Sequence, residues 1–360
     1  RYAACDLCLR PLETAEENVR RLAARPHLRL PWPQCCPTRP QEHVSCPVCQ
    51  VRYCSEACRA RAWALHHELL CAVSRDPLQP LEKLIEAWKK LHYPPETTSV
   101  LLVVRLLATL AQAEDKGTIL ATMGRLSAGL GAKEQEACLA HLLGTEWRER
   151  MNLLYRLTLN IFRGHPSVNQ WTTPEGFQLL VALLARRGQS VGTSALSVWV
   201  KNVGELELPP SERAALDSAV DGLYDDIEKE SGMFLNNEGC GLYPLQSLCV
   251  HSCRPNAEAT FPHNNHTLSL VALRDIQPGE AMSPNSILPS WQEITVSYID
   301  ECSLNRSRHS RIKILRESHL FTCTCLRCEE EASQQPDVTS DEEMEDSSDA
   351  EEAQEPAPCT

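Results

Sequence analysis

The spacing of cysteines in the first 71 residues is the feature that most constrains the fold of this chain. The pattern is Cys5-x-x-Cys8, Cys46-x-x-Cys49, Cys54-x-x-x-Cys58 and His67-x-x-x-Cys71. A Cys-x-x-Cys turn lets two thiolates face one ion, and Zn²⁺ takes about four sulfur or nitrogen ligands. Eight ligands therefore predict two zinc sites. A segment this small has little core, so bound metal would supply much of its folding energy.

Other interpretations of this segment are weaker. Scattered buried or disulfide-bonded cysteines would not require such regular spacing. His66 competes with His67 as a ligand, and the i, i+4 spacing to Cys71 on a helix favours His67. The insert between the first two pairs is predicted to begin as a helix, residues 13–24, and to continue as a proline-rich surface loop. A third metal in that insert is the minority interpretation for four residues: His27, Cys35, Cys36 and His43.

Charge and composition exclude several classes of protein. Thirteen of the 48 acidic residues lie in residues 329–360, which hold no Lys or Arg, so the rest of the chain carries 35 charges of each sign. A neutral body argues against direct nucleic-acid binding, and the tail is predicted to be disordered. No apolar run approaches the roughly 20 residues of a membrane span. Eighteen cysteines without a secretory signal favour a reducing compartment and metal binding, and so a cytoplasmic and nuclear protein.

Periodicity predicts an α+β chain. Apolar spacing favours helices over 81–88, 100–110, 133–143, 146–161, 175–186 and 211–230, whereas 117–131 is looser. Short strands are predicted at 257–261, 268–273 and 294–298. Residues 239–261 combine glycines, prolines, cysteines and a histidine, which predicts an irregular loop suited to binding chemistry. Residues 301–320 form a basic helical run whose usual meaning is a solvated face. Residues 188–201 have no assigned role.

Four motifs carry a resemblance to a known family. His251-Ser-Cys-Arg-Pro-Asn256, after Leu242-Tyr-Pro and Ser247, resembles the Asn-His-Ser-Cys-x-Pro-Asn signature of SET-domain lysine methyltransferases. Glu293-Ile-Thr-Val-Ser-Tyr298 resembles the second signature, which ends in the catalytic tyrosine. Cys323-x-Cys325-x-x-Cys328 resembles the post-SET zinc motif, and residues 5–71 resemble a MYND zinc module. In this order the motifs resemble the SMYD (SET and MYND) family.

The resemblance implies a SET fold split by a zinc module and a helical insert. The implied domains are a MYND-type module (1–75), a helical insert (76–230), the SET core (231–321), the post-SET motif (322–330) and the acidic tail (331–360). It also implies about three zinc ions held by interleaved ligands. The implied sets are Cys5, Cys8, Cys54 and Cys58; Cys46, Cys49, His67 and Cys71; and Cys253, Cys323, Cys325 and Cys328.

The resemblance further implies a protein-lysine N-methyltransferase that uses S-adenosylmethionine. Tyr298 would be the catalytic residue, with Tyr243 as a second aromatic that is equally suited to a structural role. The implied cofactor-binding residues are Ser247, Val250, His251, Tyr298 and Phe321. Implied protein partners are histone tails, ribosomal and other non-histone proteins, and proline-rich peptides for the MYND module.

Three departures from the family pattern support a second hypothesis. Val250 stands where the family has asparagine and offers no amide to the cofactor. Residues 281–292 are inserted before the tyrosine strand. The family's Gly-x-Gly-Leu strand pair, which precedes the zinc module, is expected to be missing because the given chain begins at Arg1, close to Cys5. The alternative is a zinc-dependent protein-interaction module with a degenerate, non-catalytic SET domain.

Overall fold

The computed structural model describes residues 3–36, 38–91, 100–232, 236–276 and 294–334. The chain divides into two compact units, which are described separately below. The first unit comprises residues 1–247 and 261–269, and the second comprises residues 248–260 and 270–360. The predicted insertion at 281–292 lies outside the described residues, as does nearly all of the acidic tail. The domain boundaries predicted from the sequence remain predictions.

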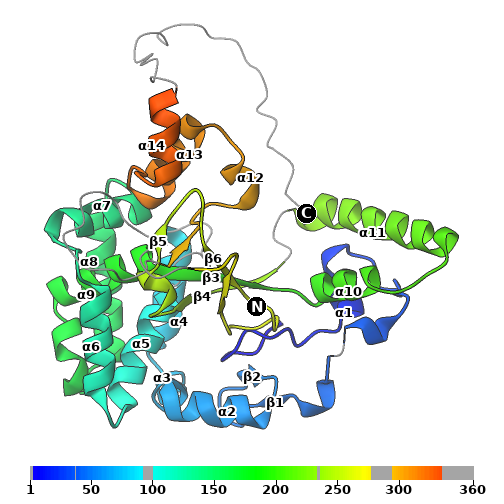
Figure 1. Ribbon diagram of the computed structural model, residues 1–360. Helices are drawn as coiled ribbons and strands as arrows, with labels where there is room; N and C mark the ends of the chain where they lie inside the picture. The colour runs from blue at the N-terminus through cyan, green and yellow to red at the C-terminus, as the bar shows by residue number, and fades with distance from the viewer. Residues whose placement is uncertain (1–2, 37, 92–99, 233–235, 277–293, 335–360) are drawn as a thin grey trace, which may run out of the picture. The chain divides into compact units, whose positions relative to one another are not determined.

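A helical bundle forms a large part of the first unit (Figure 1). Its apolar faces bury side chains such as Leu84, Leu107, Leu139 and Met151, in agreement with the helical periodicity of the sequence. The helices are α4 (Pro80–Leu91), α5 (Val100–Gln112), α6 (Lys116–Leu126), α7 (Ala132–Leu143), α8 (Trp147–Ile161) and α9 (Pro174–Arg187). None of the helices in the described part of the chain is long and apolar enough to cross a membrane.

Helix α6 corrects the expectation that residues 117–131 are loosely structured. Asp115 precedes the helix, and its carboxylate accepts hydrogen bonds from the backbone N–H groups of Gly117 and Thr118 at 2.9 and 3.3 Å. This cap satisfies donors that have no partner inside the first turn. Local capping and the burial of Met123 therefore outweigh the weak apolar pattern of the segment.

A glycine-rich pair of strands was not predicted from the sequence. Strand β3 (Gly188–Thr193) pairs antiparallel with β4 (Asn237–Leu242) over six residues. Glycine is a poor strand former, so the pattern resembled a loop. The structure shows why glycine is needed at Gly188, since a Cβ there would lie 2.5 Å from the backbone carbonyl oxygen of Leu184. Since β4 contains Gly239, the segment that starts there begins as a strand.

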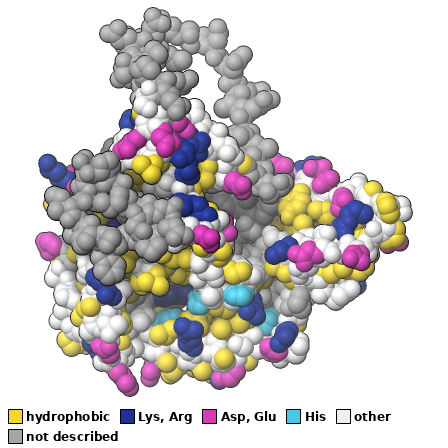
Figure 2. Space-filling view, viewed as in Figure 1, with side chains coloured by type: hydrophobic (Ala, Val, Ile, Leu, Met, Phe, Trp, Pro, Cys, Tyr) yellow, Lys and Arg dark blue, Asp and Glu magenta, His cyan; other side chains and the backbone are white. Residues whose placement is uncertain are grey.

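A second core of the first unit surrounds helix α10. Helices α1 (Ala15–Leu22) and α11 (Pro210–Ser231) pack against α10 (Ala195–Gly204), and Val19, Trp199 and Ile227 are almost fully buried there. Helix α1 begins with a capping box in which Thr14 and Glu17 satisfy each other's backbone N–H groups. Figure 2 shows hydrophobic side chains on the surface of this region, because several apolar residues pack against the core only in part.

The proline-rich part of the insert is not simply a surface loop. It contains the 3₁₀ turns η1 (Pro33–Cys35) and η2 (Pro40–Glu42). Leu30 and Cys36 are buried against the core around α10, and the indole N–H of Trp199 donates a hydrogen bond to the carbonyl oxygen of Pro31 at 3.0 Å. Most described residues of this segment are exposed, as predicted. The buried positions were not predicted because the partner that covers them lies more than 160 positions further along the chain.

The zinc-ligand segment is built from short elements. Strand β1 (Val44–Ser45) pairs antiparallel with β2 (Arg52–Tyr53), and Tyr53 is completely buried. Helix α2 (Glu56–Ala62) follows, then a π-helical turn (Trp63–His67), then α3 (Glu68–Val73). Apart from Tyr53, cysteines and a few small apolar side chains fill this core, which is consistent with a segment that depends on metal for stability.

In its described residues, the second unit combines four short strands with three helices. Strand β5 (Val250–His251) pairs parallel with β8 (Thr295–Val296), and β6 (Ala257–Thr260) lies beside β7 (Ser269–Ala272). The strands predicted at 257–261, 268–273 and 294–298 are thus present in shorter form. Helices α12 (Glu301–Leu304), α13 (Arg308–His319) and α14 (Leu326–Gln334) follow (Figure 1). The expectation that α13 is a solvated basic face is wrong at Arg311, whose side chain is completely buried.

Candidate functional site

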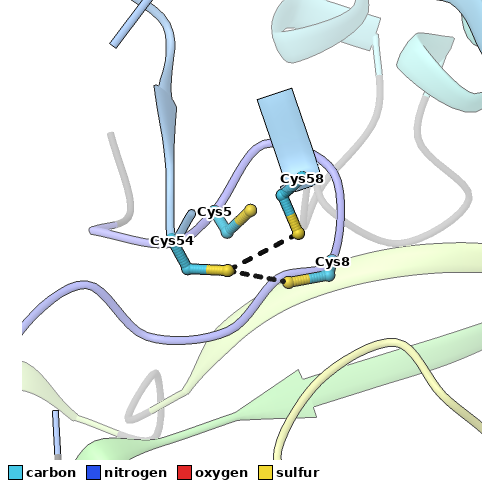
Figure 3. Close-up of side chains that lie close together, drawn as sticks. All are labelled: Cys5, Cys8, Cys54 and Cys58. Carbon is cyan, nitrogen blue, oxygen red and sulfur yellow. Dashed lines mark hydrogen bonds between the residues drawn. The ribbon is translucent and has the colours of Figure 1, made fainter. Parts of the chain in front are cut away.

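The first cysteine cluster brings together Cys5, Cys8, Cys54 and Cys58 (Figure 3). The sulfur of Cys54 lies 3.6 Å from that of Cys8 and 3.6 Å from that of Cys58. Cys54 follows strand β2, and Cys58 lies in the first turn of α2, where its backbone N–H is capped by Ser55 at 3.2 Å. The end of β2 and the capped start of α2 therefore orient Cys54 and Cys58 toward the turn that carries Cys5 and Cys8.

The second cluster brings together Cys46, Cys49, His67 and Cys71. The sulfur atoms of Cys46 and Cys71 lie 3.7 Å apart, and Nε2 of His67 lies 3.4 Å from the sulfur of Cys49. The competing residue, His66, is buried outside the cluster, and its Nε2 has no hydrogen-bond partner among the described residues. Burial, helped by the positive charge of Arg105, lowers the pKa of His66 to about 4.

The third cluster joins two distant segments of the second unit. Cys253 lies just after β5, whereas Cys323, Cys325 and Cys328 lie around the start of α14. The Cys253 sulfur lies 4.0 Å from that of Cys323 and 3.7 Å from that of Cys328. The backbone N–H of Cys253 also points at the Cys325 sulfur, at 3.4 Å. Among the residues that the structure describes, no candidate cluster includes His27, Cys35, Cys36 or His43.

The geometry of all three clusters fits zinc. With Zn–S bonds of about 2.3 Å, the sulfur atoms at the corners of a tetrahedron lie roughly 3.8 Å apart. The sulfur–sulfur distances quoted above run from 3.6 to 4.0 Å. Each set offers four ligand atoms within 4.8 Å of one another. These residues therefore have the spacing and chemistry of closed zinc sites, and zinc binding itself stays a prediction.

Tyr298 is anchored to the strand that carries His251. In the parallel pair of β5 and β8, His251 lies opposite Val296, two residues before Tyr298. The backbone N–H of Tyr298 donates to Nδ1 of His251 at 3.0 Å, and its hydroxyl donates to the carbonyl oxygen of Cys249 at 2.6 Å. The motif that contains His251 and the motif that ends in Tyr298 are therefore in direct contact.

Three aromatic rings meet at this position. The ring centroids of His251 and Tyr298 lie 5.5 Å apart, and Phe321 packs against both at 5.9 and 6.1 Å. Burial lowers the pKa of His251 to about 4, so the imidazole is neutral near pH 7. Because Nδ1 accepts from Tyr298, the ring proton resides on Nε2, which lies 3.4 Å from the Cys253 sulfur. His251 therefore links the aromatic group to the third cysteine cluster.

The sequence interpretation missed one neighbour of this group. His319, at the end of α13, has its ring 5.4 Å from that of Tyr298, and its Nε2 lies 3.1 Å from the Tyr298 carbonyl oxygen. Its position two residues before Phe321 was the only signal available. The basic run that contains His319 is typical of a solvated face, so its pattern does not indicate this contact.

The remaining predicted site residues are placed as follows. Ser247 lies in the first unit, buried, and exchanges two hydrogen bonds with the backbone and side chain of Arg187, at 3.3 and 2.9 Å. Val250 lies in the second unit on β5 and is partly exposed. Tyr243 donates its hydroxyl to the carbonyl oxygen of His266 at 2.6 Å, and burial raises its pKa to about 12. Tyr243 thus has a structural contact inside the first unit, and the cofactor roles of Ser247 and Val250 stay predictions.

Comparison with known proteins identifies the class to which these features belong. The family model for the SET domain matches residues 214–283. Together with the clusters of cysteine and histidine, this match defines a SET-domain protein, and it confirms the predicted α+β SET fold.

Full-length relatives then place the chain within that class. It is 50% identical over 347 residues to protein-lysine N-trimethyltransferase SMYD5 of Gallus gallus. The aligned residues make up 96% of this chain and 79% of the relative. It is 48% identical over 344 residues to the same protein of Homo sapiens, covering 95% of this chain and 79% of the relative. Histone-lysine N-methyltransferase SMYD3 of Mus musculus is 35% identical over 106 residues, which are 29% of this chain and 21% of that protein. The chain belongs to the SMYD5 family of SET-domain protein-lysine methyltransferases.

Proposed function

We propose that this chain transfers methyl groups from S-adenosylmethionine to lysine side chains of other proteins. The observation that carries the proposal is the anchoring of Tyr298 to Cys249 and His251, in a chain that belongs to a family of methyltransferases. When bound, S-adenosylmethionine supplies an electrophilic methyl group on a positively charged sulfur. The chain must then position a neutral amine and keep water away from it.

The residues of the second unit suit these tasks. The faces of Tyr298 and Phe321 attract a cation through their ring quadrupoles, which is the property that a sulfonium or ammonium group requires. His251 is buried and neutral, so it adds an uncharged wall without a competing positive charge. The Tyr298 hydroxyl is held by the backbone of Cys249, so the phenol enters the reaction in one orientation.

Zinc at the third cluster supports this arrangement. Cys253 lies two residues after His251, and Cys323 lies two residues after Phe321. An ion held by both cysteines would fix the aromatic ring of Phe321 against those of His251 and Tyr298. The zinc ions of the other two clusters would stabilise residues 5–71, where little apolar core exists.

The proposed substrates are histone tails and ribosomal or other non-histone proteins. The name of the SMYD3 relative, a histone-lysine methyltransferase, supports the first of these. We further propose that residues 5–71 act as a MYND-type module that binds proline-rich peptides, since Val48 and Trp63 expose apolar side chains on it. With these substrates, the proposed location of the protein is the cytoplasm and the nucleus.

The test is transfer of a labelled methyl group. The zinc-loaded chain is incubated with S-adenosylmethionine carrying a labelled methyl, together with core histones or ribosomal proteins. We expect label on lysine, found by mass spectrometry of the digested substrate. Tyr298→Phe should abolish most of the transfer, while Tyr243→Phe, which loses only its contact with His266, should retain it. If the zinc-loaded chain transfers no label to any of these substrates, the proposal is contradicted.

One observation favours a second function. Val250 presents an apolar, partly exposed side chain at the position where the resemblance predicts an amide. A chain with a weakened cofactor site would act through its zinc segment as a protein-interaction module. In cells, that function predicts that Tyr298→Phe has no effect, whereas Cys49→Ser, which removes a candidate ligand of the second cluster, abolishes function. The opposite result would favour catalysis.

A further inference from the structure

Arg311 is a fully buried cation on a helix that the sequence assigned to solvent. The residue is 0% exposed. Its Nη2 lies 3.8 Å from the sulfur of Cys328 and 2.7 Å from a carboxylate oxygen of Glu331, and its Nη1 donates to the carbonyl oxygen of Arg306 at 2.6 Å. One buried guanidinium therefore contacts a candidate zinc ligand, an acid and the backbone.

Glu331 alone does not explain the burial of Arg311. The side chain of Glu331 is one-third exposed, and its other carboxylate oxygen accepts from Nε of Arg327 at 2.8 Å. One partly solvated carboxylate is thus shared by two guanidinium groups. A buried charge requires compensation by nearby opposite charge, because desolvation is costly. Additional negative charge must lie close to Arg311.

The third cysteine cluster supplies that charge when it holds zinc. Four thiolates around one Zn²⁺ leave a net charge of about −2 on the site. Cys328, which faces Arg311, is itself buried, so the attraction is only weakly screened. An N–H donor directed at a zinc-bound thiolate also withdraws electron density from the sulfur, which makes it a weaker nucleophile and a more persistent ligand.

We propose that Arg311 is a positioning residue of the third zinc site, which protects the Cys328 thiolate and holds the metal in place. The proposal rests on zinc binding by this cluster and is independent of whether the chain transfers methyl groups. Its rival is that Arg311 merely forms a buried ion pair that stabilises the packing of α13 against α14. The two ideas differ in whether the third zinc site, beginning at the Cys328 sulfur, or the whole unit responds to loss of the guanidinium.

Site-resolved alkylation separates these ideas. The zinc-loaded full chain and its Arg311→Met variant are treated with iodoacetamide, and alkylation of each cysteine is followed by mass spectrometry. Zinc release is followed in parallel with a coloured chelator. In Arg311→Met, a charge-assisted hydrogen bond is lost. We therefore expect Cys328 to be alkylated, and one zinc per chain to be released, roughly 10-fold or more faster than in the parent. The cluster of Cys5, Cys8, Cys54 and Cys58 is the internal control and should keep its rate.

Arg308→Met provides the matched control. Arg308 lies on the same helix, and its Nε donates to the backbone carbonyl oxygen of Cys328 at 2.9 Å. This contact involves the main chain of Cys328 and not its sulfur. We expect its Cys328 rate to stay within about twofold of the parent, because the thiolate keeps its donor. In cobalt-substituted protein, only Arg311→Met should shift the sulfur-to-cobalt charge-transfer bands.

Two results would overturn the proposal. The first is an unchanged Cys328 rate in Arg311→Met, and the second is an equal acceleration at Cys328 in Arg308→Met and Arg311→Met. If Arg311→Met does not fold, Arg311→Lys is measured instead, since it keeps the charge and loses the planar fork of donors. We then expect an intermediate Cys328 rate, and a rate equal to that of the parent contradicts the proposal.

Discussion

The hydroxyl of Tyr298 donates a hydrogen bond to the backbone carbonyl oxygen of Cys249, 2.6 Å away. The two residues are 49 positions apart and meet because β5 and β8 run parallel. The backbone N–H of Tyr298 is held in turn by the ring of His251. Two hydrogen bonds therefore fix both the main chain and the phenol of the residue on which the proposed chemistry depends.

Replacement of Tyr298 by phenylalanine tests that relationship. The variant keeps the ring contacts with His251 and Phe321 but loses the bond to Cys249. We expect the turnover number for methyl transfer to fall by roughly 100-fold, because the hydroxyl that would align the amine with the methyl group is removed and loss of alignment has effects of this size. The dissociation constant of S-adenosylmethionine should change by less than about 10-fold. An equal loss in turnover and in cofactor affinity would show that Tyr298 acts mainly in binding.

The three cysteine clusters predict the metal content. Elemental analysis should find about three zinc ions per chain, because four ligands form each closed site. Cys253→Ser should remove about one ion, since this residue contributes to a single cluster. Cys138→Ser is the control, because Cys138 is buried in α7 outside the clusters and should leave the metal content unchanged. Retention of all the zinc in Cys253→Ser would contradict the third site.

Restoring an amide at position 250 should strengthen the cofactor site. Val250→Asn offers hydrogen bonds where the resemblance predicts contact with S-adenosylmethionine, and such a bond is worth about 1 kcal/mol or more. We expect the dissociation constant to fall by roughly 5- to 10-fold, measured by calorimetry. Val271→Asn, at another exposed valine of the second unit, is the control and should have no effect. Unchanged or weaker binding in Val250→Asn would place the cofactor elsewhere.

The buried imidazole of His66 predicts a pH dependence of stability. Burial and Arg105 lower its pKa to about 4, whereas in the unfolded chain it titrates near pKa 6.5. Between these values the unfolded state binds more protons than the folded state. The free energy of unfolding should therefore decrease as pH falls from about 6.5 towards 4, by up to about 1.4 kcal/mol per pH unit from this group.

The contribution of His66 is isolated by comparison with a variant. Zinc release also depends on pH, because the ligands must be deprotonated, so the zinc content of both proteins is measured at each pH. Urea unfolding at about pH 7.5 and about pH 5.5 should give a smaller pH-dependent loss for His66→Phe than for the parent. The same loss in both proteins would mean that His66 is not held neutral in the folded state.

The sequence predicted the features that depend on local spacing. The zinc-ligand pairs are recognisable because their members lie two to four residues apart. The resemblance implied how the pairs combine into sets, and the structure brings each implied set together. The resemblance to the SET family assigned Tyr298 and His251 to one site, and the structure brings the two residues into contact. Helix periodicity gave α4, α5, α8 and α9, because each buries one long apolar face.

Features that depend on distant partners were not predicted. Strands β3 and β4 contain glycines and lie far apart in the sequence, so only their pairing in the structure shows that they are strands. The sequence around Leu30 has the pattern of a surface loop, whereas in the structure Leu30 is buried against the core that contains Trp199. Arg311 sits in a basic run, and its burial is decided by a cysteine cluster assembled from two other segments. In each case, tertiary contact outweighed the local pattern.

Calorimetric titration of S-adenosylmethionine into the zinc-loaded chain tests the central claim most directly. The account predicts one binding site per chain with a dissociation constant in the micromolar range, near −8 kcal/mol. It also predicts weaker binding after Cys253→Ser, because that change releases the loop that supports Phe321. Absence of binding by a folded chain with its zinc sites filled would contradict the proposed methyltransferase and favour the interaction module.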